Sequence, residues 1–276
     1  MEKLQKALEK ARAERLARQG MPTGSQRDSA SVERAITDQA SAWAQLPECK
    51  LSAQELKKNR VLTFNANSEA TYYDILRTRL RDECRRQNYK RIAITSPQPQ
   101  AGKSTTLANL AFSLGRLPYQ RTIIFDFDLR RPSLHKILGL TPKADMGQLL
   151  RGEVPVDEHL VRHGENLAFG LNKSMVQHSA ELLQSERTQD FLTAVEETFQ
   201  PDLMLFDMPP FLAADDAHGF LKNIDAVLLI AESEKTTKVQ LDAVEQKISS
   251  LTKIAGIVLN KCNYVDENDT GSYDYY

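Results

Sequence analysis

The sequence lacks long apolar runs and an excess of charge of either sign. Among its 276 residues, Ala226 to Ala231 is one of the longest apolar runs, far below the roughly 18 residues that a membrane-spanning helix needs. The amino terminus does not open with the basic stretch and apolar run of a secretory signal. With 36 Lys and Arg against 37 Asp and Glu, the chain lacks the excess of basic residues that is typical of nucleic-acid-binding proteins. We expect a chain that does not cross a membrane by itself and has no nucleic-acid partner.

Cysteine is also scarce. Cys49, Cys84 and Cys262 lie too far apart for the spacing of a zinc site, and an odd number leaves one thiol over in any disulfide scheme. A reducing cytoplasm is the compartment that this usage favours.

The first 67 residues differ from the rest of the chain in composition and hydrophobic pattern. Residues 1–19 are predicted to form a helix with a narrow apolar stripe among Lys and Arg. Such a helix can be solvated, dock on a partner or lie on anionic lipid, and the sequence leaves these three open. Residues 20–67 are predicted to be a linker with short helices, in which Trp43 is a local packing anchor.

From residue 68 to 262, short β-branched runs alternate with helical patterns. The predicted strands are 91–95, 122–126, 166–169, 203–207, 226–231 and 254–259, and the main predicted helices after the first strand are 104–116, 180–198 and 236–251. Alternation of this kind predicts an α/β fold with a mostly parallel sheet covered by helices on both faces. Ligands of such a sheet bind at the carboxyl ends of the strands.

A short motif at the end of the first predicted strand indicates a phosphate-binding loop. Gly102 allows close approach of the backbone, Lys103 supplies a positive charge for β and γ phosphates, and Ser104 supplies a hydroxyl for magnesium. The apolar strand before the motif and the apolar helix after it make the interpretation specific.

Two further strands end in carboxylates. Asp126 and Asp128 follow one strand, and Asp207 follows another. A carboxylate at the end of a buried strand is costly to desolvate, and a magnesium ion with its phosphates would compensate it. For any one of them alone, a turn or capping role is the simpler alternative.

The last fourteen residues, 263–276, are acidic and contain half of the eight tyrosines, with no basic residue. These tyrosines are Tyr264, Tyr273, Tyr275 and Tyr276. Such a segment cannot bury enough apolar surface to fold alone. It is either a disordered acidic terminus or a set of phosphate acceptors.

Together these residues resemble the bacterial tyrosine kinases of polysaccharide synthesis, the BY-kinases, of the cytoplasmic CpsD/CapB-like type. The shared motifs are Ser96, Pro99, Gly102, Lys103 and Ser104; Asp126, Asp128 and Arg130; Asp207, Pro209 and Pro210; and the tail tyrosines. The resemblance implies a P-loop NTPase-like fold and the cofactors ATP and Mg²⁺.

The resemblance also implies roles for individual residues. Catalytic roles fall to Lys103, Asp126, Asp128 and Arg130; nucleotide binding to Gln100, Ala101, Gly102, Lys103, Ser104, Thr105 and Asn260; metal binding to Ser104, Asp128 and Asp207; and the acceptor role to the four tail tyrosines. Of the carboxylates, Asp126 is expected to accept the proton of the phenol.

Several positions depart from the family pattern. Gln100 and Ala101 stand where the family often has Gly and an acidic residue. This difference can alter the conformation of the loop and the rate of enzymatic turnover. Of the family's Glu-x-x-Arg-x-x-Arg ring motif only Arg77 matches, with Thr71 and Asp74 at the other positions.

The resemblance implies an autokinase that regulates exopolysaccharide synthesis or export. Expected partners are a membrane polysaccharide co-polymerase (chain-length regulator), other copies of the chain and a cognate tyrosine phosphatase. The expected location is the cytoplasm, with peripheral recruitment to the inner face of the plasma membrane. The alternatives are a non-kinase ATPase of the ParA/MinD type and a nucleotide-binding scaffold. Gln98, where such ATPases often carry a second lysine, argues against the first alternative.

Overall fold

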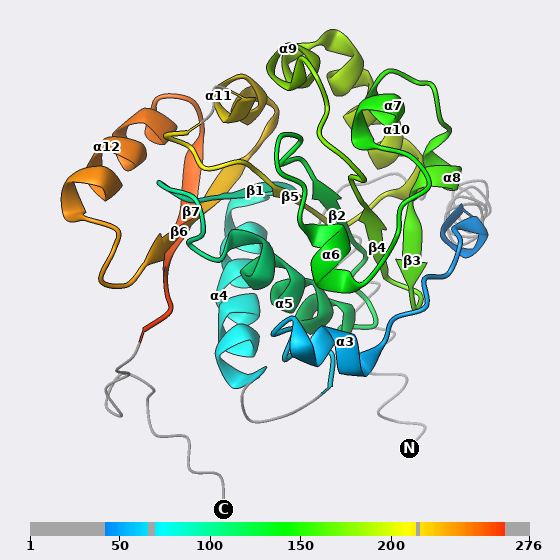
Figure 1. Cartoon of the computed structure of the whole chain (residues 1–276), viewed down its shortest axis with the longest axis horizontal. Coiled ribbons are helices and arrows are strands. Elements are labelled where there is room, and N and C mark those ends of the chain that lie inside the picture. Colours follow the sequence, from blue (N-terminus) through cyan, green and yellow to red (C-terminus); the bar gives the residue numbers. More distant parts are fainter. Residues whose placement is uncertain (1–41, 66–69, 214–215, 263–276) are drawn as a thin grey trace, which may run out of the picture. The chain divides into compact units, whose positions relative to one another are not determined.

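A seven-stranded sheet in the order β3-β4-β2-β5-β1-β6-β7 organises the chain (Figure 1). The computed structural model describes residues 42–65, 70–213 and 216–262. The strands are β1 Arg91–Thr95, β2 Thr122–Asp126, β3 Val161–His163, β4 Leu167–Gly170, β5 Leu203–Asp207, β6 Ala226–Glu232 and β7 Lys253–Asn260. All neighbouring strands pair in parallel except β3, which runs antiparallel to β4 at one edge. The mostly parallel sheet is therefore confirmed.

Helices cover the sheet in two groups. On one face lie α3 Ala53–Lys58, α4 Thr71–Gln87, α5 Lys103–Gly115 and α6 Leu134–Leu138. On the other lie α7 Met146–Leu150, α9 Ser179–Gln184, α10 Glu186–Phe199, α11 Asp216–Phe220, the 3₁₀ turn Leu221–Asn223 and α12 Lys238–Ser249, while α8 Val156–His159 precedes β3. Each group packs its own apolar cluster against the sheet, which makes a three-layer α/β structure.

The alternation of side chains along the buried strands creates these two cores. In β1, Ala93 joins the cluster under α10 and α12, whereas Ile92 and Ile94 join the cluster under α4 and α5. Both faces are apolar because both are covered, so the strands appear in the sequence as continuous apolar runs.

One predicted helix is divided in the structure, and one strand was not predicted. The helix expected over 180–198 is two helices, because Ser185 has extended backbone (φ -72°, ψ 153°) that ends α9 and begins α10. Strand β3 was not expected, since three residues are too few to show a period.

Residues 42–65, expected to be linker, pack on the sheet unit, which begins at Ala42. Trp43, Leu46 and Leu56 are buried, and the indole Nε1 of Trp43 donates to the carbonyl of Phe199 over 2.7 Å. The boundary expected at residue 68 therefore lies within the folded unit. Apolar residues in a polar segment contact a core that is distant in sequence, which local composition cannot reveal.

In the described part of the chain, no helix has both the length and the apolar character needed to cross a bilayer. The expected helix over 1–19 and the tyrosine tail 263–276 lie outside the described residues.

Candidate nucleotide site

The phosphate loop connects β1 to α5 at the carboxyl edge of the sheet. Gly102 stands directly before the helix with a φ of 93°, in the left-handed region. A Cβ on Gly102 would lie 2.2 Å from Nδ2 of Asn260, so both the backbone conformation and the space require glycine.

The amino terminus of α5 is suited to an anion. Its first N–H groups have no partner within the helix, and the first turn carries no acidic residue. Lys103 begins the helix, and although it is a lysine its residue is only 7% exposed. Phosphate groups bind in such places because backbone N–H groups, helix dipole and ammonium act together.

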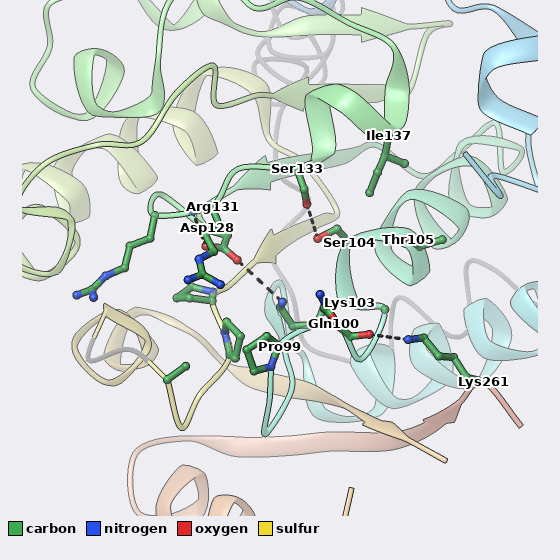
Figure 2. A pocket seen from close by; sticks show the side chains of 15 residues that line it. Pro99, Gln100, Lys103, Ser104, Thr105, Asp128, Arg131, Ser133, Ile137 and Lys261 are labelled. Carbon is green, nitrogen blue, oxygen red and sulfur yellow. Dashed lines mark hydrogen bonds and ion pairs between the residues drawn. The ribbon is translucent and has the colours of Figure 1, made fainter. Parts of the chain in front are cut away.

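The carboxylates expected from the strand ends do meet here. Strands β2 and β5 are neighbours, with Asp126 paired in register with Asp207. Beyond β2, the Oδ2 atom of Asp128 lies 4.0 Å from Nζ of Lys103 (Figure 2). Parallel strands end at the same edge, which is why residues so far apart in sequence converge.

Burial dominates the electrostatics of these acids. Desolvation raises the pKa of Asp207 to about 7, against the opposing charge of Lys103. It also raises the pKa of Asp128, again opposed by Lys103. The pKa of Asp126 is raised well above its usual range by burial first, and then by repulsion from Asp207 and Asp128. A positive charge that enters the site would reverse these shifts.

An open cavity of about 610 Å³ lies over the loop. Its lining includes Pro99, Gln100, Gly102, Lys103, Ser104, Thr105, Asp128, Arg130, Arg131, Ser133, Pro209, Pro210 and Lys261. Figure 2 shows Lys103 and Asp128 directed toward each other from α5 and the segment after β2. Ser133 donates to the hydroxyl of Ser104 over 2.9 Å, which orients that side chain.

The residues present fit a magnesium-bound triphosphate. Both carboxylate oxygens of Asp207 and Oδ1 of Asp126 are buried without a partner of good hydrogen-bond geometry in the described structure, although the hydroxyl of Ser104 is near enough to lower the pKa of Asp207. Buried polar atoms are normally satisfied, so these oxygens mark a place for a cation or its water. Within residues 42–65, 70–213 and 216–262, no group of three acidic, His or Cys side chains could hold a metal by itself. Phosphate oxygens and water would have to complete the coordination, as is usual for Mg²⁺.

Two expected site residues, Arg130 and Asp126, make contacts that their motifs did not indicate. Arg130 makes two hydrogen bonds of 2.8 Å to the buried carboxylate of Asp216, which also accepts from Ser179. The guanidinium of Arg130 therefore pairs with Asp216, a fourth carboxylate that the three motifs did not include. Asp126 accepts from the backbone N–H of Leu134. Asp126 and Asp207 are both fully buried and neither lines the cavity, whereas Asp128 does.

The structure adds contacts that the motifs did not indicate. Asn260, expected to bind the nucleotide, donates from its side chain to the carbonyl of Ala101, and the next residue, Lys261, donates to the carbonyl of Gln100. Lys261 also pairs with Glu232 at the end of β6. The rule that drew attention to Asp126 and Asp207, a carboxylate at the end of a buried strand, would have found Glu232.

Comparison with known proteins agrees with this geometry. Residues 88–276 match the family model described as "ParA: NUBPL iron-transfer P-loop NTPase". The tyrosine-protein kinase YwqD of Bacillus subtilis is 28% identical over 209 residues, which cover 75% of this chain and 86% of YwqD. The putative tyrosine-protein kinase AmsA of Erwinia amylovora is 28% identical over 226 residues, but this chain spans only 31% of its length.

Solved structures share the fold. The kinase domain of the Escherichia coli tyrosine kinase ETK superposes with a TM-score of 0.65 and 23% identity, covering 76% of this chain and 82% of that one. The septum site-determining protein MinD from Pyrococcus horikoshii, complexed with Mg-ADP, gives 0.52 and 19%, covering 64% and 72%. The relatives' names support protein-tyrosine kinase activity and confirm the resemblance drawn from the motifs. The chain therefore belongs to the ParA family of P-loop NTPases, and its relatives include bacterial tyrosine-protein kinases.

Proposed function

We propose that this chain is an ATP- and Mg²⁺-dependent protein-tyrosine autokinase that phosphorylates Tyr264, Tyr273, Tyr275 and Tyr276 and regulates exopolysaccharide synthesis or export. One observation carries the proposal: the end of β7 touches the phosphate loop, through Asn260 on the carbonyl of Ala101. The tyrosine-rich segment begins three residues later, at 263. At roughly 3.3 Å per residue its fourteen residues can extend about 46 Å, enough to reach this site or that of another copy.

In this proposal the site residues position phosphate groups and neutralise their charge, which is most of what phosphoryl transfer requires. Lys103 and the N–H groups at the start of α5 bind the β and γ phosphates. Ser104, Asp128 and Asp207 hold Mg²⁺, partly through water. When bound, the ion neutralises the charge that develops on the phosphate oxygens.

The acceptor phenol, with a pKa near about 10, needs a nearby group that takes its proton. Asp126 is the proposed acceptor. Burial and repulsion from Asp207 and Asp128 raise its pKa, and a bound cation would lower it again, so Asp126 is expected to be ionised, and able to take the proton, only when the site is loaded. Its complete burial requires that the phenol or a water reach it past Asp128.

The test is transfer of label from ATP in the presence of Mg²⁺. We expect phosphotyrosine in the wild-type chain, none in Lys103→Met and none when the four tail tyrosines are changed to Phe. Tyr119→Phe is the matched control, because Tyr119 is 96% exposed and lies outside the tail. Label that persists after the tail substitutions would contradict the proposed acceptors.

A second candidate is a non-kinase ATPase of the ParA/MinD type, which the family model and the MinD fold favour. It predicts release of free phosphate with no phosphotyrosine in the same assay. A nucleotide-binding scaffold predicts neither product.

We also propose recruitment to the membrane by a membrane-embedded polysaccharide co-polymerase, through residues 1–19, with a cognate phosphatase that reverses the modification. Deletion of residues 1–19 is expected to move the chain from the membrane fraction to the supernatant of cell lysates that contain the co-polymerase. Unchanged co-fractionation would contradict the role of this segment.

A further inference from the structure

The phosphate loop contains a residue in an unfavourable conformation. Gln100 has a φ of 65°, in the left-handed region where a Cβ crowds the neighbouring carbonyl oxygen. Glycine adopts this conformation without that cost, whereas glutamine keeps it only if its surroundings hold it.

The contacts that hold this segment come from the end of β7. Nζ of Lys261 donates to the carbonyl of Gln100 over 2.7 Å, and Nδ2 of Asn260 donates to the carbonyl of Ala101 over 2.8 Å. In a planar trans peptide the C=O and the following N–H point in opposite directions. Fixing these two carbonyls therefore directs the N–H groups of Ala101 and Gly102 away from β7. Figure 2 shows Lys261 on the side of the loop opposite to Asp128.

Lys261 is itself anchored. Its ammonium lies 3.0 Å from Oε1 of Glu232, a residue that is 4% exposed and lies opposite Asn260 in the β6–β7 pairing. The same oxygen pairs with Lys235 at 2.7 Å. Among the described residues, the side chain of Lys235 makes no hydrogen bond to the loop backbone, and it is 64% exposed.

We infer that Lys261, anchored by Glu232, is a positioning residue that holds the phosphate loop in its anion-binding conformation and so sets nucleotide affinity. It acts through the carbonyl of Gln100. The inference rests on the proposed function only in requiring that the cavity takes a nucleotide; it does not require tyrosine phosphorylation.

The test is titration of the full chain with a fluorescent ADP analogue and Mg²⁺. Lys261→Met is expected to raise the Kd about tenfold or more, by analogy with the loss of metal affinity by about 10- to 100-fold when an outer-shell partner of a metal ligand is removed. Lys235→Met, which removes a partner of the same carboxylate but no loop contact, is expected to stay within about twofold. Lys261→Arg restores a charged donor and should recover most of the affinity.

Two further readouts separate positioning from general stability. Lys261→Met should raise the KM for ATP far more than it lowers kcat, and the Tm of the nucleotide-free protein should change little. Adding Gln100→Gly to Lys261→Met should recover part of the affinity, because glycine needs less support at a positive φ.

A Kd for Lys261→Met equal to that of the wild type would overturn the inference, as would equal weakening by Lys235→Met. If the wild-type chain binds nucleotide but forms no phosphotyrosine, the kinase proposal fails while these affinities still decide the role of Lys261.

Discussion

At the scale of single residues, the site is defined by buried carboxyl groups that are incompletely hydrogen-bonded in the described part of the chain. Asp126 and Asp207 lie side by side at the ends of two strands with oxygens that have no partner of good hydrogen-bond geometry among the described residues. Natural proteins seldom leave such groups unsatisfied except at functional sites. The arrangement is therefore better explained by a bound cation than by the stability of the fold.

The role of Asp126 can be tested by Asp126→Asn, which keeps the shape of the side chain but cannot take a proton. We expect the rate of tyrosine phosphorylation to fall by about 10²- to 10⁴-fold, the usual contribution of a general base. Nucleotide affinity should be largely retained, as measured by the same fluorescent titration. Phosphorylation at the wild-type rate would show that another group takes the proton.

The raised pKa of Asp207, about 7, predicts a pH dependence of the metal-free protein. Between its usual value and about 7, the folded state keeps a proton that the unfolded state releases, so stability falls as pH rises through this window. Asp207→Asn removes this contribution and should gain stability relative to the wild type as pH increases from 5 to 8. Each unit of pKa corresponds to roughly 1.4 kcal/mol.

Thermal unfolding in EDTA at both pH values measures this difference. The comparison reports on Asp207 and Asp126 together, because the substitution also removes the repulsion that raises the pKa of Asp126. A difference between the proteins that does not change with pH would contradict it. Mg²⁺ with ADP should stabilise the wild type more at the higher pH, where the carboxylate is already ionised.

At the scale of elements, the segment before α4 contributes to the core although it follows a polar stretch. Trp43 is 2% exposed, lies edge-on against Phe199 with ring centroids 6.2 Å apart, and has the guanidinium of Arg121 over its ring. These contacts attach the first described residues to the end of α10.

Trp43→Ala is expected to lower the free energy of unfolding by about 3–5 kcal/mol, because it removes a large buried ring and a buried hydrogen bond. Urea denaturation followed by circular dichroism measures the change. Tyr119→Ala, at an exposed position, should stay within about 0.5 kcal/mol. A loss below about 1 kcal/mol for Trp43→Ala would mean that the segment is only loosely attached.

At the scale of the whole molecule, the proposed reaction couples phosphorylation to assembly. Arg77, the one match to the ring motif, donates to Asp74 and to the carbonyl of Ser113 of its own chain. We therefore expect association to depend on docking of the tail of one copy in the site of another. Each phosphate adds about -1.5 to -2 charges to an acidic segment, so phosphorylation should weaken docking beside ATP.

Light scattering should accordingly show a lower mass after incubation with ATP and Mg²⁺ than before, and no change for Lys103→Met. Equal mass before and after phosphorylation of the wild type would contradict the cycle of assembly and release.

The sequence by itself predicted the strands of the parallel sheet, the phosphate loop and the edge at which the carboxylates meet. This was possible because the signals are local: apolar runs, a Gly-Lys-Ser turn and an acid at the end of each of two strands. The family could likewise be identified from the order of its motifs. The exact helix boundaries were less accessible, since the break at Ser185 depends on how α9 and α10 pack.

Only the tertiary structure decided which partners the charged groups take. In the structure Arg130 pairs with Asp216, and Asp126 is buried and does not line the cavity. Lys261, paired with Glu232, contacts the backbone of the loop. These pairings join residues that are far apart in sequence, and no local period or spacing encodes them. The sequence fixes which groups are available, and the packing of the sheet and its helices determines which of them meet.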